Sequence, residues 1–233
     1  MTSVYFIMAN GTMRKAIGGM DIHEFLSFKK PIFADSGGFT QGRLQLQFDQ
    51  REILEFQEGI NCDAAATLDF PLFKCNTGRD KKKRVERTIK NIGIALEKRT
   101  DKRMLLYGCV HGHNAKEVDD FLDKLEDSGY LKALDGLAVG SVEPNHAKYM
   151  DLLEIICTVR NRSSKPCHVF GMTRFSMIPF LLMCGCDSFD SKTFAHASRF
   201  RMWIHPDSLR RIHISKLRSI CRCRACRRYS LSD

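Results

Sequence analysis

Short apolar runs alternate with longer amphipathic stretches along the whole chain. Each run is rich in β-branched, aromatic or small apolar residues and ends in glycine or a polar residue, which is typical of buried strands. The pattern predicts seven strands. They are expected in Val4–Asn10 (VYFIMAN), Pro31–Asp35 (PIFAD), Ala64–Phe70 (AAATLDF), Met104–Gly112 (MLLYGCVHG), Gly136–Ser141 (GLAVGS), Cys167–Met172 (CHVFGM) and Cys186–Ser191 (CDSFDS).

The stretches between the runs have helical spacing. In NAKEVDDFLDKLEDSG the apolar residues Val118, Phe121, Leu122 and Leu125 recur every three or four positions, and Gly129 is a stop signal. Strands that alternate with helices form parallel sheets with crossover helices. Since no Gly-x-Gly-x-x-Gly fingerprint is present, a TIM-type (β/α)8-like barrel is favoured over a doubly wound sheet. Such a barrel needs eight strands, so we expect one that lacks a strand or closes in an unusual way.

Polar residues end most of the predicted strands. In a β/α barrel, active residues stand at the C-terminal ends of the strands. We therefore expect these side chains to converge on one mouth, although Asp and Ser before two glycines, as in DSGG, also suit a simple turn. The residues are Asp35, Asp69, His111, Ser141 and Asp190.

The composition is that of a globular protein with an excess of basic residues. Of 233 residues 43% are hydrophobic, which is enough for the core of one large domain, alone or with a small appendage. We expect the barrel domain over residues 1–200 and a basic C-terminal segment over 201–233. Lys and Arg number 37 against 27 acidic residues, and the formal charge of +10 favours a polyanion as partner. The basic residues concentrate in Gly78–Arg103 and near the C-terminus. Solvated helix faces would explain either run alone.

Cysteine usage points to a reducing compartment. Several of the ten cysteines, such as Cys109, Cys184 and Cys186, lie in apolar runs, as buried thiols do. No apolar run is long enough to cross a membrane, and the first residues lack a basic leader. We expect a cytoplasmic protein.

Six segments resemble, in order, the tRNA-guanine transglycosylase superfamily, whose members exchange a guanine in nucleic acid for a 7-deazaguanine. The resemblance runs from about Val4 to Ser230 and implies a β/α barrel with a small C-terminal zinc-binding segment. The segments are DSGGF (35–39), DAAATLDFP (63–71), YGCVHGH (107–113), DGLAVGSVEP (135–144), HVFGMT with CGCDSFDS (168–173 and 184–191) and CRCRACRRYS (221–230).

The sequence departs from the family pattern at several positions. The family's first strand has no counterpart. His111 stands where the family has Gln, Gly140-Ser141 replaces a Gly-Gly pair, and Thr40 follows Phe39 in place of Gln. We expect that the chemistry is kept, while base selection and partner have drifted.

The resemblance assigns the two catalytic carboxylates. Asp190 would be the nucleophile that captures C1′ of the sugar, and Asp35 the general acid/base that protonates the leaving guanine and deprotonates the incoming base. This is the two-carboxylate logic of retaining glycosidases. A helix N-cap is the structural alternative for Asp190.

The remaining candidates would bind the base. A carboxylate such as Asp69 accepts both adjacent donors of guanine's Watson–Crick edge. Aromatic rings would stack on the base, and amides beside glycine would approach its carbonyl oxygen. The predicted substrate-binding set is Ser36, Phe39, Asp69, His111, Gly140, Ser141 and Phe170.

The spacing C-x-C-x-x-C of Cys221, Cys223 and Cys226 suits tetrahedral Zn²⁺. We expect a structural zinc, with unmetallated thiols as the alternative. In the family a downstream His completes the site, and here His205 or His213 are candidates for the fourth ligand.

The type of nucleic acid is the most open question that the sequence leaves. The compact chain and the LDFP sequence resemble the DNA-modifying branch of the superfamily, known from phages and bacterial gene clusters, so DNA is favoured as substrate and a preQ0-like 7-deazaguanine as incoming base. A queuine- or archaeosine-type enzyme acting on tRNA is the alternative. A non-catalytic nucleic-acid-binding partner subunit is the alternative of another class, and a homodimer or helper proteins are expected partners.

Overall fold

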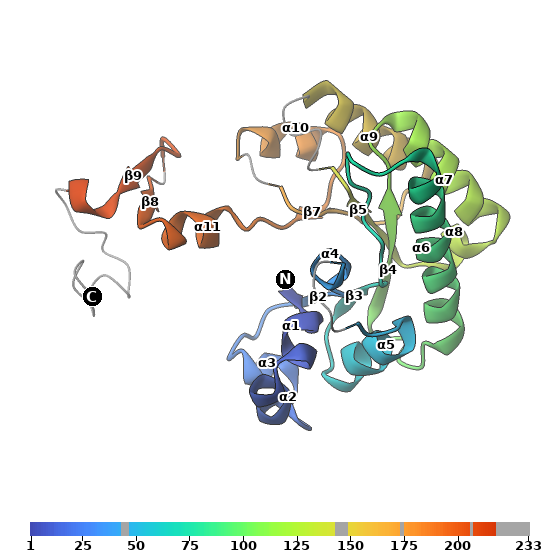
Figure 1. The fold of residues 1–233 in the computed structure, drawn as a ribbon, viewed down its shortest axis with the longest axis horizontal. Helices are drawn as coiled ribbons and strands as arrows, with labels where there is room; N and C mark the ends of the chain where they lie inside the picture. The colour runs from blue at the N-terminus through green and yellow to red at the C-terminus, as the bar shows by residue number, and fades with distance from the viewer. Residues whose placement is uncertain (43–46, 143–148, 173–174, 206, 218–233) are drawn as a thin grey trace.

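The computed structural model describes residues 1–42, 47–142, 149–172, 175–205 and 207–217. Seven parallel strands form one curled sheet in which every strand pairs with its neighbour in the sequence (Figure 1). They are β1 (Thr2–Ser3), β2 (Phe33–Asp35), β3 (Ala64–Ala66), β4 (Leu105–His111), β5 (Gly136–Gly140), β6 (Cys167–Val169) and β7 (Ser188–Phe189). The alternation of strand and helix and the parallel order are confirmed.

The sheet has the topology of a β/α barrel that is not closed by hydrogen bonds. Within the described residues, β1 pairs with β2 alone and β7 with β6 alone. The sheet is thus a curled half-barrel, compatible with the predicted TIM-type fold.

The prediction of the first strand is wrong. Val4–Asn10 forms helix α1 (Val4–Ala9), and the strand is the preceding pair Thr2–Ser3. The buried residues Val4, Ile7 and Met8 have helical spacing. An uninterrupted apolar run satisfies both the helical and the strand period, so the run alone could not decide between them.

Helices α6 (Gly78–Lys98), α7 (Ala115–Asp127) and α9 (Tyr149–Arg162) cover the outer face of the sheet (Figure 1). In α7 the residues predicted to face the core, Val118, Phe121, Leu122 and Leu125, are all buried, and Gly129 adopts the left-handed conformation with φ 73° after the helix. Apart from α1, the helices are α2 (Gly11–Ile17), α3 (Ile22–Phe25), α4 (Gly38–Gln41), α5 (Gln50–Gly59), α6 (Gly78–Lys98), α7 (Ala115–Asp127), α8 (Tyr130–Ala133), α9 (Tyr149–Arg162), α10 (Ile178–Met183) and α11 (Thr193–Arg199), with 3-10 turns η2 (Phe175–Met177) and η3 (Ile214–Lys216).

Strand alternation divides the core into two layers. Every second residue of a strand, such as Leu106 and Val110 of β4, packs against the helices. The residues that alternate with these form a small inner cluster of Ala66, Tyr107, Cys109 and Ala138, with Phe33, Ala64 and Phe170 against it. This inner layer combines small side chains with the aromatic rings of Tyr107, Phe33 and Phe170.

The C-terminal part departs from the sheet. After α11, strands β8 (Met202–Ile204) and β9 (Arg211–His213) form an antiparallel hairpin that lies to one side of the barrel (Figure 1). The division at residue 200 stays a prediction. None of the helices in the described part of the chain is both long and apolar enough for a membrane span.

Candidate active site

A cavity of about 550 Å³ lies at the C-terminal ends of the strands. This volume suits a small ligand such as a base with part of its sugar. Asp35, Asp69 and Asp190 all line it, although Asp35 belongs to β2, Asp69 follows β3 and Asp190 follows β7. The other lining residues are Met1, Phe39, Thr40, Pro71, Leu72, Phe73, Lys74, Gly140, Ser141, Val142, Phe170, Gly171 and Lys192.

Asp35 is the last residue of β2. Burial raises the pKa of its carboxyl to about 6, and the nearby charges of Asp69 and Asp190 act in the same direction, while a hydrogen bond from the Gly37 backbone N–H opposes them. A carboxyl with a pKa near 6 can both give and take a proton near neutral pH.

Glycine is required at positions 37 and 38 for two different structural reasons. Gly37 has φ 82° and precedes α4, and a Cβ there would stand 2.3 Å from the Cβ of Tyr5. A Cβ on Gly38 would stand 2.0 Å from Oδ1 of Asp69. The DSGG segment is therefore a turn, and its second glycine also brings the backbone against Asp69.

A buried imidazole lies behind Asp69. Nε2 of His111 lies 3.0 Å from Oδ2 of Asp69, although the ring N–H does not point straight at that oxygen. Nδ1 of His111 lies 2.9 Å from Oγ of Ser141, and the Leu72 backbone N–H donates to the same Oγ at 2.7 Å. The His111 side chain is 0% exposed and lies behind the cavity wall, so its position does not support the predicted contact with the base.

Asp190, which also lines the cavity, has a related environment. The Gly171 backbone N–H donates to its Oδ1 at 2.7 Å, and Nε2 of His168 lies 3.6 Å from the same oxygen. Nδ1 of His168 lies 2.9 Å from Oγ of Ser188, its partner in the β6–β7 register. Each of the two carboxylates thus has a buried histidine and a serine behind it.

Sequence reasoning missed His168. This residue is in the centre of β6 and faces the inner layer, where its ring stacks on Phe33 with centroids 4.6 Å apart. The alternation of side chains along the strand could have identified it. Cys167 and Val169 face the helices, so the polar residue between them faces the barrel interior.

Two aromatic residues of the predicted base-binding set, Phe39 and Phe170, line the cavity. Phe170 makes edge contacts with His168 and Phe33, and Phe39 lies 5.9 Å from Phe73 between ring centroids. Phe73 belongs to the segment after Asp69, which also brings Leu72 and Lys74 to the cavity and which no sequence motif had indicated.

Gly140 and Ser36 differ in their access to the cavity. Gly140 lines it and lies beside His111, because a Cβ on Gly140 would stand 2.6 Å from that ring. Ser36 is fully buried outside the lining, and its Oγ has no hydrogen-bond partner among the described residues.

The predicted zinc ligands Cys221, Cys223 and Cys226 lie outside the described residues. Within the described ranges no three His, Cys, Asp or Glu side chains form a metal-binding group. The zinc site stays a prediction.

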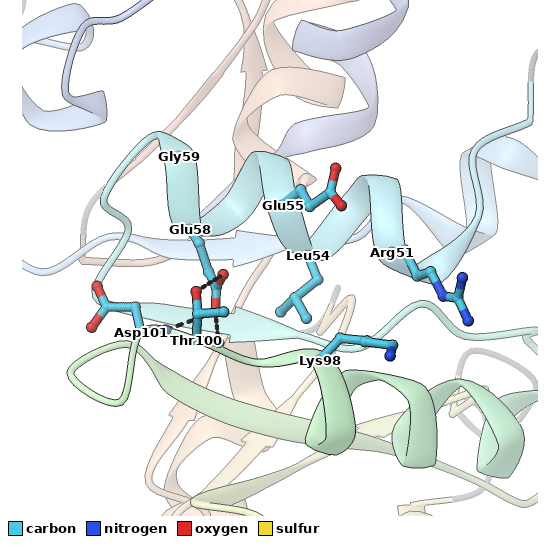
Figure 2. A pocket seen from close by; sticks show the side chains of 8 residues that line it. All are labelled: Arg51, Leu54, Glu55, Glu58, Gly59, Lys98, Thr100 and Asp101. Atoms are coloured by element: carbon cyan, nitrogen blue, oxygen red, sulfur yellow. Dashed lines mark hydrogen bonds between the residues drawn. The ribbon is translucent and has the colours of Figure 1, made fainter.

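A second cavity of about 500 Å³ lies near the opposite ends of the strands, between α5 and the end of α6 (Figure 2). Its central carboxylate, Glu58, accepts hydrogen bonds from the Thr100 backbone N–H, the Thr100 hydroxyl and the Asp101 backbone N–H. These contacts join α5 to the segment before β4, so the role of Glu58 here is structural.

Comparison with known proteins covers the whole chain. The model of the family described as TGT, queuine tRNA-ribosyltransferase, matches residues 1–233. A tRNA-guanine(15) transglycosylase of Methanocaldococcus jannaschii is 28% identical over 242 residues, which are 99% of this chain and 36% of the relative. Those of Methanosarcina mazei and Methanococcus aeolicus are 27% and 26% identical over 241 and 243 residues, or 48% and 36% of their lengths. The chain spans less than half the length of these relatives.

Proposed function

The chain belongs to the queuine tRNA-ribosyltransferase family, and from this premise we propose that it exchanges a guanine in tRNA for a 7-deazaguanine base. The observation that carries the proposal is that Asp35, Asp69 and Asp190 meet around one cavity, which Phe39 and Phe170 also line. Each carboxylate has a distinct task in base exchange.

In the first half-reaction Asp190 is the nucleophile. Its Oδ1 is occupied by the Gly171 N–H, so Oδ2 is the oxygen that attacks C1′. The C1′–N9 bond breaks as the new C1′–O bond forms, and the leaving guanine takes the bond's electron pair and the proton of Asp35.

In the second half-reaction the sequence of events is reversed. The 7-deazaguanine enters, its N9–H passes the proton to ionised Asp35, and N9 attacks C1′ as the bond to Asp190 breaks. Two inversions retain the sugar configuration. A pKa of about 6 at Asp35 suits a group that must hold the proton in one half-reaction and accept it in the other.

Base recognition falls to Asp69 and the aromatic pair. The carboxylate of Asp69 accepts hydrogen bonds from the N1–H and the 2-amino group of guanine, while Phe39 and Phe170 stack on the faces of the base. The amides at Gly140 and Ser141 would meet the base carbonyl. A 7-deazaguanine presents the same edge, so both bases fit one pocket.

The choice of polymer follows the relatives, which are named for tRNA, and so tRNA is better supported than the DNA that the compact chain favoured. A basic stripe of Arg79, Lys83 and Arg87 on α6 supports a phosphate backbone as ligand. The three side chains have i, i+4 spacing, and none has a carboxylate within 4.0 Å in the described part of the chain. Lys74 lines the cavity, and α6 begins four residues later. The basic stripe therefore starts near the cavity and continues along α6.

The second candidate function is that of a non-catalytic partner subunit. Loss of a catalytic carboxylate would favour it, and this chain has both Asp35 and Asp190 at the cavity. We also propose that Cys221, Cys223 and Cys226 bind a structural zinc. Metal analysis of the purified protein against a Cys223→Ser variant tests this, with a loss of bound zinc expected.

The deciding experiment incubates the protein with a 7-deazaguanine base and either tRNA or duplex DNA, followed by digestion and mass spectrometry of the nucleosides. Modified ribonucleoside that disappears in Asp190→Ala is expected. Asp187→Asn is the matched control, because Asp187 precedes β7 and contacts Arg160 away from the cavity. Modified deoxynucleoside would restore DNA as the substrate, and no product on either polymer would favour the partner subunit.

A further inference from the structure

The two departures from the family's base-binding segments contact each other. His111, in place of Gln, and Ser141, in place of Gly, are thirty residues apart in sequence, yet Nδ1 and Oγ are 2.9 Å apart. The β4–β5 register pairs His111 with Gly140, which brings Ser141 beside the ring. Two substitutions that look independent in the sequence form one structural unit.

The hydrogen bonds of Ser141 indicate which ring nitrogen of His111 carries the proton. Oγ of Ser141 accepts the Leu72 backbone N–H, so the hydroxyl proton is available to Nδ1 of His111. With Nδ1 as acceptor, the neutral ring carries its proton on Nε2, which lies 3.0 Å from Oδ2 of Asp69 but is not aligned for a hydrogen bond to it. The unit therefore places an N–H dipole beside the carboxylate that reads the base.

The surrounding residues restrict its movement. The ring of His111 is completely buried, in a T-shaped contact with Phe121 and close to the Gly140 backbone. Ser141 has φ 60°, a conformation that glycine adopts without strain and serine does not. The hydroxyl contacts to His111 and Leu72 explain why serine occupies this position.

We infer that His111 and Ser141 are positioning residues that fix the carboxylate of Asp69 and so determine how strongly the site prefers a base with a 2-amino group. This inference rests on the proposed function. Gly38 lies against Asp69 on the Oδ1 side and His111 on the Oδ2 side, so both oxygens have a close neighbour that restricts rotation of the carboxylate. A fixed carboxylate accepts both donors of guanine, whereas hypoxanthine, which lacks the 2-amino group, makes one of the two contacts.

The test compares guanine with hypoxanthine in two assays: binding of the free bases by equilibrium dialysis, and exchange into tRNA. The variants are His111→Phe, which keeps an aromatic ring and removes both nitrogens, Ser141→Gly, and the double variant. We expect each single variant to lower the preference for guanine by about tenfold, through KM for the base with little change in kcat. The double variant should be no worse than His111→Phe, because the two residues act in series.

Ser141→Gly keeps the test valid if His111→Phe does not fold, because glycine relieves the left-handed backbone. His111→Gln should restore part of the preference, since an amide N–H can replace the imidazole N–H. His23→Gln is the matched control: Nε2 of His23 lies 3.1 Å from Asp63, before β3 and at the other end of the barrel, and its loss should leave the preference unchanged.

Two results would overturn the inference, and they are distinguishable. If wild-type protein exchanges guanine and the folded variants keep its preference over hypoxanthine, the positioning role is wrong and the proposed function stands. If wild-type protein neither binds guanine nor exchanges it on tRNA or DNA, the proposed function fails and the inference with it.

Discussion

The backbone of Gly38 lies directly against the carboxylate of Asp69, and a Cβ at position 38 would come within 2.0 Å of Oδ1 and 2.4 Å of the Asp69 carbonyl oxygen. This close approach joins the turn after β2 to the end of β3. The second glycine of DSGGF is thus required by its neighbour across the sheet, since its own φ is not in the left-handed region.

Replacing Gly38 by alanine is expected to displace Asp69 and reduce base exchange by at least about a hundredfold, because a misplaced carboxylate no longer meets the base edge. Exchange kinetics and guanine binding measure the effect. Gly42→Ala is the control at the end of the same helix, where a Cβ would have its nearest atom at 3.5 Å. Equal activity of the two variants would contradict the steric argument.

Asp35→Asn should stabilise the protein at neutral pH. The pKa of Asp35 is raised from 3.8 to about 6 in the folded state, so between these values the folded protein holds more protons than the unfolded chain. The wild type therefore loses stability as pH rises from about 4 to about 6, by about 2 to 3 kcal/mol, and the loss is constant above that.

Urea unfolding at pH 4 and pH 7 measures this difference. Asp35→Asn and the wild type should differ more at pH 7 than at pH 4. Asp120→Asn, on the exposed face of α7, should show no such change. A gap between Asp35→Asn and the wild type that stays constant with pH would argue against the raised pKa.

His168→Phe is expected to slow formation of the covalent protein–tRNA intermediate by about tenfold, because the variant removes the ring nitrogen beside Asp190 while it keeps the stacking on Phe33. The rate of adduct formation on a denaturing gel is the readout. His196→Phe, on exposed α11, is the control. An unchanged adduct rate in folded His168→Phe would mean that Gly171 alone orients Asp190.

Neutralising Arg79, Lys83 and Arg87 together to glutamine should weaken tRNA binding. The dependence of log Kd on log salt should fall by roughly 0.7 to 0.9 for each phosphate that the stripe no longer neutralises. Binding of free guanine should not change, since the stripe lies outside the cavity. Lys29→Gln with Lys30→Gln, both exposed before β2, is the matched control. A salt dependence equal to that of the wild type would exclude the stripe from the interface.

The sequence is most informative at the ends of its apolar runs. Asp35, Asp69 and Asp190 follow such runs, and the parallel order of the strands brings these ends together. The six later strands lie within their predicted runs. The prediction for Val4–Asn10 is wrong because an uninterrupted apolar run has no polar positions to reveal its period.

The parts of the site that depend on register could not be predicted. His168 lies beside Ser188 because β6 and β7 pair at those residues. The hydrogen bond between Leu72 and Ser141 joins positions 69 residues apart. Such neighbours are set by tertiary packing, and no local pattern records them.

The position of Asp69 has a consequence for engineering. Three different strands supply its surroundings, with Gly38 after β2, His111 at the end of β4 and Ser141 after β5. A library that randomises one loop at a time would meet a clash or a broken hydrogen bond at almost every step. Altered base selectivity is therefore most accessible through linked changes at these three positions, screened together.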